Sequence, residues 1–126
     1  MPNTPPIELD QRVVRTAPTD VKAQQADVLN YTQFLTQILE QHYIQQYPDS
    51  TNKLTFTVET GRRYLKIIQD NSVHAFVDKT TGDVYKPASW SAPAKHIRFT
   101  FQNVDHLKFL LNPDNVGWAG GYLYIR

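Results

Sequence analysis

The chain has 126 residues, a length typical of one globular domain. Of these residues 40% are hydrophobic and 20% are charged, which is not the composition of a disordered protein. Thirteen lysines and arginines against twelve aspartates and glutamates give a formal charge of +1, which argues against a protein that coats duplex DNA or an anionic membrane. The absence of cysteine excludes a disulfide framework, a thiolate metal site and a cysteine nucleophile. No apolar run approaches the roughly 20 residues of a membrane span, and the first residues do not resemble a signal peptide.

The N-terminal segment is rich in proline. Residues 1–18 hold four of the eight prolines and show almost no periodic apolar pattern. Such a composition is typical of an extended arm, which becomes ordered on the surface of its own domain or of a neighbouring protein. We therefore expect a Pro-rich arm over residues 1–19 and a single domain over residues 20–126.

A long helix is predicted over residues 20–46. Thr19 or Asp20 is suited to the N-cap position, and Pro48 prevents the helix from continuing. Apolar residues recur at spacings of three, four and seven, which is typical of a helix with one buried side. They include Val21, Val28, Leu35, Ile38 and Leu39. A helix of about 40 Å is longer than a small sheet needs for cover, so we expect spare surface for another subunit.

From residue 53 the apolar period changes to two, which predicts strands over residues 54–59, 63–68 and 72–78 and a return strand from residue 84. In the third strand the alternation places Val73, Ala75 and Val77 on one face. His74 and Phe76 then fall on the other face. Gly82 is expected at a positive φ angle in the hairpin loop before the return strand.

The last third of the chain is predicted to contain a strand over residues 96–101, a short helix and a final strand over residues 122–126. The short helix is capped by Asn103 and runs through Leu111. Pro87 and Pro93 exclude a central strand between them, so residues 87–95 are expected to form a loop. This order of elements predicts an α+β fold, with an antiparallel sheet of about five to six strands and the helices on one face.

The sequence lacks the residue combinations that catalysis and metal binding use. None of the four histidines accompanies a nucleophile-elbow serine, and no HxH, HxxxH or DxD pattern is present. Phosphate-binding loops of the Walker type and the Rossmann glycine pattern are also absent. We therefore expect no catalytic residues, no metal and no cofactor, and a hydrolase is the least favoured class.

The densest group of unusual residues lies at positions 86–98, KPASWSAPAKHIR, where two prolines stiffen a loop around Trp90. The positively charged candidates beside it are Lys86, Lys95, His96 and Arg98. An aromatic ring beside cations is suited to stacking a base and holding a phosphate. The simpler interpretation, which the sequence favours, is that Trp90 plugs the open end of the sheet and the prolines protect an edge strand. A weaker second cationic group consists of Arg62 and Arg63 with Tyr64.

Three motifs are specific enough to suggest a relationship. They are SVHAFVDKTTGDVYKPASW at 72–90, APAKHIR at 92–98 and the ending WAGGYLYIR at 118–126. These segments resemble small uncharacterised proteins encoded by tailed bacteriophages, especially those of marine bacteria and cyanobacteria. The likeness covers somewhat under half of the chain. It implies a viral origin and a similar fold, and it carries no established chemistry.

Two functional hypotheses from different classes are consistent with these patterns. The first is a non-enzymatic phage-type protein, a virion or assembly component that acts through homo-oligomerisation or contacts with other phage proteins. The second is a small-ligand binder that sequesters a nucleotide-type host signal, with Trp90 stacking on the base and Lys95 and Arg98 on the phosphates. The charge of +1 makes nucleic acid an unlikely partner, no membrane contact is expected, and the expected location is the host cytoplasm or the virion.

Overall fold

The computed structural model describes residues 21–51 and 53–124. Its elements are, in chain order, α2 (Val21–Gln46), β1 (Phe56–Thr60), β2 (Tyr64–Gln69), β3 (Ser72–Asp78), β4 (Asp83–Tyr85), β5 (Phe99–Thr100), α3 (Val104–Leu110) and the 3-10 helix η1 (Gly121–Tyr124). The strands form one antiparallel sheet in the order β1-β2-β3-β4-β5, which confirms the predicted α+β class. The predicted arm over residues 1–19 and the helix N-cap lie outside the described residues.

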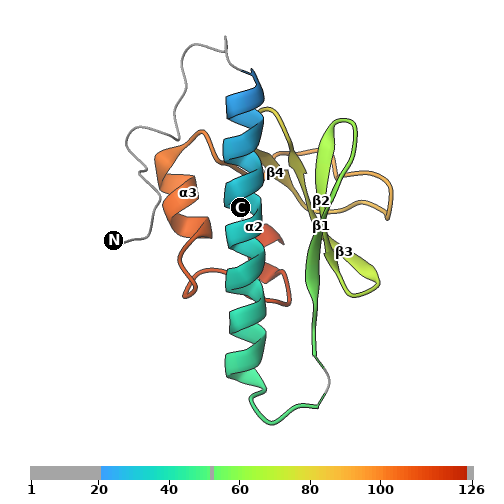
Figure 1. The fold of residues 1–126 in the computed structure, drawn as a ribbon, viewed down its shortest axis with the longest axis vertical. Helices are drawn as coiled ribbons and strands as arrows, with labels where there is room; N and C mark the ends of the chain where they lie inside the picture. Colours follow the sequence, from blue (N-terminus) through green and yellow to red (C-terminus); the bar gives the residue numbers. More distant parts are fainter. Residues whose placement is uncertain (1–20, 52, 125–126) are drawn as a thin grey trace.

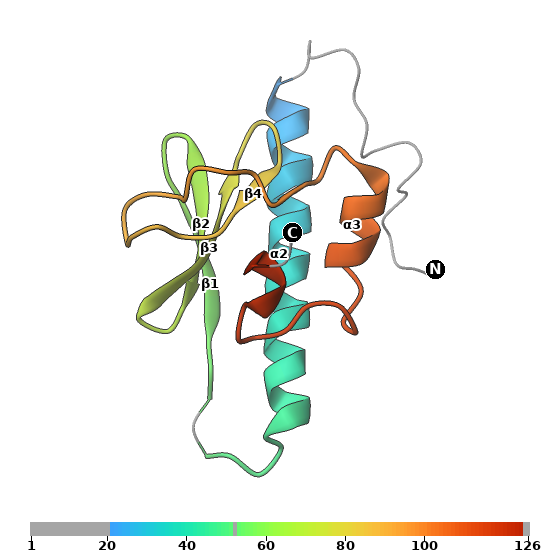
Figure 2. The same cartoon turned by 180° about the vertical axis from the view of Figure 1, so that it is seen from behind.

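The long helix α2 covers one face of the sheet, which we call the inner face; the opposite face is the outer face. Both cartoon views place α3 on the other side of α2 from β1–β3 (Figures 1 and 2). The buried side chains of α2 begin at Val28, whereas Val21 is exposed. The predicted buried side of the helix therefore begins too close to the N-terminus. Leu35 and Leu39 are fully buried against the sheet. At the other end of the helix Ile44 is also exposed.

The third strand, β3, contains a β-bulge. Ile67 of β2 pairs with Ala75 and its neighbour Ile68 pairs with Val73, so His74 is an extra residue between two regular pairs. An inserted residue reverses the alternation on one side of the insertion. The predicted faces are therefore correct for Ala75 and wrong for the residues that precede it.

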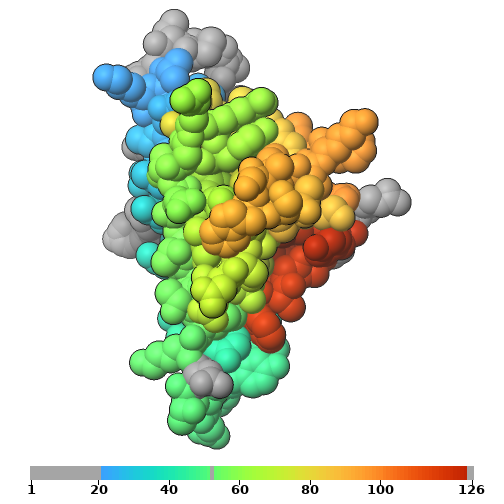
Figure 3. Space-filling model, turned by 90° about the vertical axis from the view of Figure 1, so that its right-hand side faces the viewer, coloured from blue at the N-terminus to red at the C-terminus, as the bar shows by residue number. Residues whose placement is uncertain are grey.

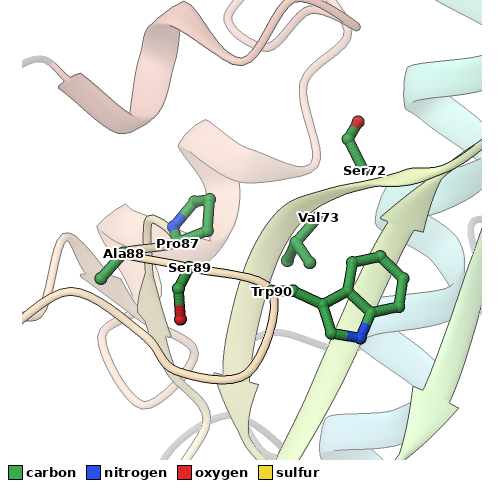
Figure 4. Close-up of a pocket in the computed structure, with 6 residues that line it drawn as sticks. All are labelled: Ser72, Val73, Pro87, Ala88, Ser89 and Trp90. Atoms are coloured by element: carbon green, nitrogen blue, oxygen red, sulfur yellow. The ribbon is translucent and has the colours of Figure 1, made fainter.

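The bulge turns His74 inward and Val73 outward. The His74 ring lies on the inner face, where its centroid is 5.4 Å from that of Phe56 and its Nε2 is 2.7 Å from the hydroxyl oxygen of Tyr122. Val73 instead lies on the outer face, beside Trp90 (Figure 4). Alternation in the sequence could not predict this exchange, because the inserted residue is recognised only through its pairing with β2.

The hairpin between β3 and β4 is closed by Asp78 and Gly82. The Asp78 carboxylate accepts hydrogen bonds from the backbone N–H groups of Thr80 (2.9 Å) and Thr81 (3.0 Å). Gly82 has the predicted positive φ angle, +79°, and a Cβ atom there would come within 2.9 Å of the Phe101 Cβ atom. The turn therefore needs glycine both for its backbone angle and for the space beside Phe101.

Replacing Gly82 by alanine is expected to lower the free energy of unfolding by about 2 kcal/mol, because the new methyl group adds a steric clash to an unfavourable φ angle. Urea unfolding of the variant and the wild type measures this difference. Gly121→Ala is the matched control, since no atom lies within 4 Å of a Cβ placed there. Gly121 has neither a positive φ angle nor a close neighbour, so equal losses in the two variants would show that neither feature of Gly82 has an energetic consequence.

Two of the predicted C-terminal strands differ from the structure. The strand expected over residues 96–101 is only Phe99–Thr100, because β4, with which it pairs, is three residues long. The prediction of a strand over residues 122–126 is wrong for residues 122–124, because the chain forms η1 over Gly121–Tyr124. Residues 125–126 lie outside the described residues. Tyr122 and Leu123 are both buried, although they are adjacent, and a strand would place them on opposite faces. Gly120, at φ +81°, turns the chain into this helical turn.

The short helix α3 was predicted correctly, together with its cap. The side-chain oxygen of Asn103 accepts hydrogen bonds from the N–H groups of Asp105 and His106 at 2.9 and 3.2 Å. Leu107 and Leu110 are fully buried, so this helix closes the core beside α2.

Candidate functional site

Residues 86–98, which we call the Trp90 loop, cross the outer face as an ordered arch. Pro87 and Pro93 form an isolated β-bridge, and the N–H of Ala94 donates to the carbonyl oxygen of Lys86 at 2.8 Å. At the tip, two further N–H groups donate to the carbonyl oxygen of Ala92. In the space-filling view the loop, in orange, lies against the green and yellow-green strands (Figure 3). The backbone bonds hold Trp90 in position before any ligand or partner arrives.

Trp90 is not a core residue. It is 50% exposed, so the interpretation of Trp90 as a plug of the open sheet end is wrong. The ring lies over β2 and β3, and the Lys66 Nζ atom is 4.4 Å from the ring centroid, a cation–π geometry. A hollow of about 310 Å³ opens between the ring and the backbone of the loop (Figure 4). Its lining residues are Ser72, Val73, Pro87, Ala88, Ser89 and Trp90.

The cations that the sequence placed near Trp90 lie elsewhere. The Lys86 Nζ atom is 4.6 Å from the centroid of the Tyr124 ring. Lys95 and His96 are exposed. The backbone N–H of Arg98 donates to the Val84 carbonyl oxygen, and its Nε atom is buried without a hydrogen-bond partner among the described residues. None of these four cations lines either of the two hollows described here, so the structure does not bring the predicted set together.

A second hollow, of about 220 Å³, lies between the β1–β2 hairpin and the Trp90 loop. Its lining residues are Glu59, Gly61, Arg62, Arg63, Tyr64, Lys66, Phe76 and Ser91. We call it the Lys66 hollow. The weaker cationic group of the sequence analysis is therefore the one that lies at a concave surface, and Lys66 is the residue that the sequence reasoning missed. Alternation along residues 63–68 predicts that Lys66 lies on the same face as Tyr64. The contact between Lys66 and the Trp90 ring, however, forms only when the loop folds over this face.

Electrostatics around the Lys66 hollow are set mainly by basic groups. The Nε atom of Arg63 is 3.4 Å from an oxygen of Asp78, and its guanidinium lies 5.2 Å from the Tyr64 ring centroid. Burial raises the pKa of the Asp78 carboxyl, but the N–H groups of Thr81 and Thr80 and the Arg63 guanidinium outweigh burial, so that the pKa is lowered overall. Asp78 is thus ionised at neutral pH and holds the hairpin and Arg63 together.

Three of the four histidines have hydrogen-bond partners inside the fold. His42 Nδ1 accepts from the backbone N–H of Trp118, and His106 Nδ1 accepts from that of Thr100. His74 is buried between Tyr122 and Gln69, and burial lowers its pKa to about 4. In the described ranges, no three histidine or carboxylate side chains gather as a metal-binding group.

Residues 14–125 of the chain match a family of unknown function, DUF7717, and the chain belongs to this family. No curated protein and no solved structure matches the chain. Among the described helices, none combines the length and the apolar character that crossing a membrane requires.

Replacing Trp90 by alanine is expected to change the free energy of unfolding by about 1 kcal/mol or less, because half of the residue's surface is already in water and only part of its contact area is lost. Urea unfolding followed by circular dichroism measures the change. Leu123→Ala, which removes a fully buried side chain, is the control and should cost about 2–5 kcal/mol. A loss in Trp90→Ala as large as in the control would restore the plug interpretation.

Proposed function

We propose that this is a non-enzymatic phage-type protein that acts through protein contacts, first between copies of itself and then with other proteins of a phage assembly. The observation that carries the proposal is Trp90, a large aromatic ring that is 50% exposed on an ordered loop. The phage setting is supported by the resemblance of the segments at 72–90, 92–98 and 118–126.

The Trp90 loop has the physical properties of a contact site. Tryptophan is among the residues that most often dominate the energy of protein interfaces, since it buries a large area with few rotatable bonds. The loop is already held by backbone hydrogen bonds, so a contact there avoids much of the entropy cost of ordering a flexible segment. A second exposed apolar group, at the C-terminal end of α2, includes Ile44 and Tyr47.

Size-exclusion chromatography with light scattering tests the proposal. We expect the wild type to show a mass above the 14.5 kDa of one chain as concentration rises, and Trp90→Ala to shift towards one chain. Ile44→Ala tests the other apolar group. It leaves the Trp90 loop intact, so its mass shows whether the C-terminal end of α2 also contributes to the contact. A wild-type protein that stays at 14.5 kDa at high concentration, and is absent from virions by mass spectrometry, would refute the proposal.

A second candidate function is the binding of a nucleotide-type small molecule, with Lys66 in place of the Lys95 and Arg98 that the sequence suggested. The observation that favours it is the Lys66 ammonium against the Trp90 ring, beside two hollows on the outer face. A thermal-shift screen against linear and cyclic nucleotides tests it. A ligand at 100 times its dissociation constant adds about 2.7 kcal/mol, which in a domain of this size raises Tm by several degrees. The absence of any shift would remove this candidate.

A further inference from the structure

The ammonium group of Lys66 is held in an unusual environment. Only 14% of its side chain is exposed, and its Nζ atom lies 4.4 Å from the Trp90 ring centroid and 5.8 Å from that of Phe76. The carboxylate of Glu59 is its ion-pair partner, but the Nζ–Oε1 distance of 3.6 Å exceeds hydrogen-bond length, and no described residue accepts a hydrogen bond from Nζ. An ammonium group has three N–H donors. The Lys66 Nζ atom is not among the described polar atoms that are buried without a partner, so water reaches these donors and an oxyanion can replace that water.

The hollow beside Lys66 is basic and has aromatic walls. Arg62, Arg63 and Lys66 line it against a single carboxylate, that of Glu59. Arg63 directs its Nε towards Asp78, and its side chain is 69% exposed, so most of the guanidinium remains accessible to a ligand. The volume of about 220 Å³ is below the roughly 300–1,000 Å³ of pockets for drug-sized molecules. The hollow therefore suits one small charged group with one flat ring.

We propose that the Lys66 hollow is a binding site for a single oxyanion, a carboxylate or a phosphate, carried next to a flat ring. Lys66 and Arg62 donate charge-assisted hydrogen bonds to the oxyanion, and the rings of Tyr64 and Phe76, which line the hollow, contact the flat group. The oxyanion can belong to an acidic side chain of a protein partner or to a nucleotide-type molecule. This inference goes beyond the proposed self-contact, because a monomer also contains the site.

An NMR titration of the full chain with four probes tests the site. The probes are phenyl phosphate, phenylacetate, benzyl alcohol and inorganic phosphate. We expect saturable shifts of the Trp90 indole N–H and of the Lys66 and Arg62 backbone signals with the two ring-bearing anions, and binding about tenfold weaker for benzyl alcohol and for inorganic phosphate. Tighter binding of phenyl phosphate identifies a phosphate source, and equal or tighter binding of phenylacetate identifies a carboxylate source.

Variants separate this site from general charge attraction. Lys66→Met should weaken the binding of phenyl phosphate and phenylacetate by about tenfold, whereas Lys66→Arg, which keeps the charge, should retain most of it. Arg62→Gln changes an exposed residue and gives a second readout if Lys66→Met does not fold. Lys95→Met is the control, since Lys95 is an exposed cation that does not line the hollow.

Three results would overturn the proposal: no saturable shifts with either ring-bearing anion, equal binding of benzyl alcohol, or unchanged affinity in both Lys66→Met and Arg62→Gln. Light scattering of the same samples reports the self-contact separately. If the oxyanion does not bind but the protein associates, the proposed function stands and the oxyanion site is refuted. If the protein binds phenyl phosphate but remains a monomer, the oxyanion site stands and the proposed self-contact is refuted.

Discussion

Phe101→Ala is expected to lower the free energy of unfolding by about 3–5 kcal/mol, the usual cost of removing a buried large aromatic side chain. Phe101 is only 2% exposed, and its ring makes an edge contact with the Tyr31 ring of α2 at a centroid distance of 5.7 Å. It also packs against Gly82 in the β3–β4 hairpin. One side chain therefore joins the long helix to the hairpin that precedes the Trp90 loop.

Chemical denaturation at neutral pH measures the loss, which is a large part of the roughly 5–15 kcal/mol available to a domain of this size. Phe109→Ala is the matched control, because Phe109 is only partly buried and stacks on Phe99 at the edge of the core. It should cost clearly less than Phe101→Ala. Equal losses would mean that the helix-to-hairpin contact is not a main source of stability.

Acid is expected to destabilise the fold by about 3 kcal/mol between pH 6.5 and pH 4 through His74 alone. His74 is 6% exposed and burial lowers its pKa from 6.5 to about 4. Its Nε2 accepts from the Tyr122 hydroxyl at 2.7 Å, and its Nδ1–H donates to the Gln69 side-chain oxygen at 3.1 Å. Both bonds suit the neutral ring, and burial also raises the pKa of the Tyr122 hydroxyl.

The direction of the effect follows from proton uptake. The unfolded chain protonates this histidine near pH 6.5, whereas the folded chain does so only near pH 4, so the unfolded state binds more protons between these values. Stability is therefore complete above about pH 6.5 and falls as the pH decreases to 4. The lowered pKa of Asp78 acts in the same direction, but only below its ordinary value of 3.8.

Urea unfolding at a series of pH values measures this dependence. His74→Gln keeps a hydrogen-bonding side chain without a group that titrates, so its stability should be lower at neutral pH but much flatter between pH 6.5 and pH 4. His96→Gln changes an exposed histidine and should keep the wild-type slope. If His74→Gln and the wild type show the same slope, the buried histidine is not the acid-sensitive group.

Local patterns were sufficient to predict most of the fold. The apolar spacing located α2, the change of period located β1–β3, and the side chain of Asn103 marked the start of α3. Gly82 was placed correctly because a tight hairpin needs a residue that tolerates positive φ. Each of these features depends on residues that are close together in the sequence.

The features that were missed depend on contacts between distant residues. The bulge at His74 is defined by pairing with β2, and the helical turn η1 is fixed by the burial of Tyr122 against that histidine. The candidate site was predicted around Trp90, but its cation was sought within the same loop. The cation that approaches the ring, Lys66, is on β2, so the site exists only after the loop folds over the outer face.

The most direct test of the contact role is the accessibility of Trp90 as the protein concentration rises. In a Trp118→Phe background the fluorescence reports Trp90 alone, and acrylamide quenching measures its exposure to solvent. We predict a readily quenched, red-shifted ring in dilute protein and a progressive loss of quenching as copies associate. A ring that remains equally quenchable up to millimolar protein would contradict the claim that Trp90 forms the contact between copies.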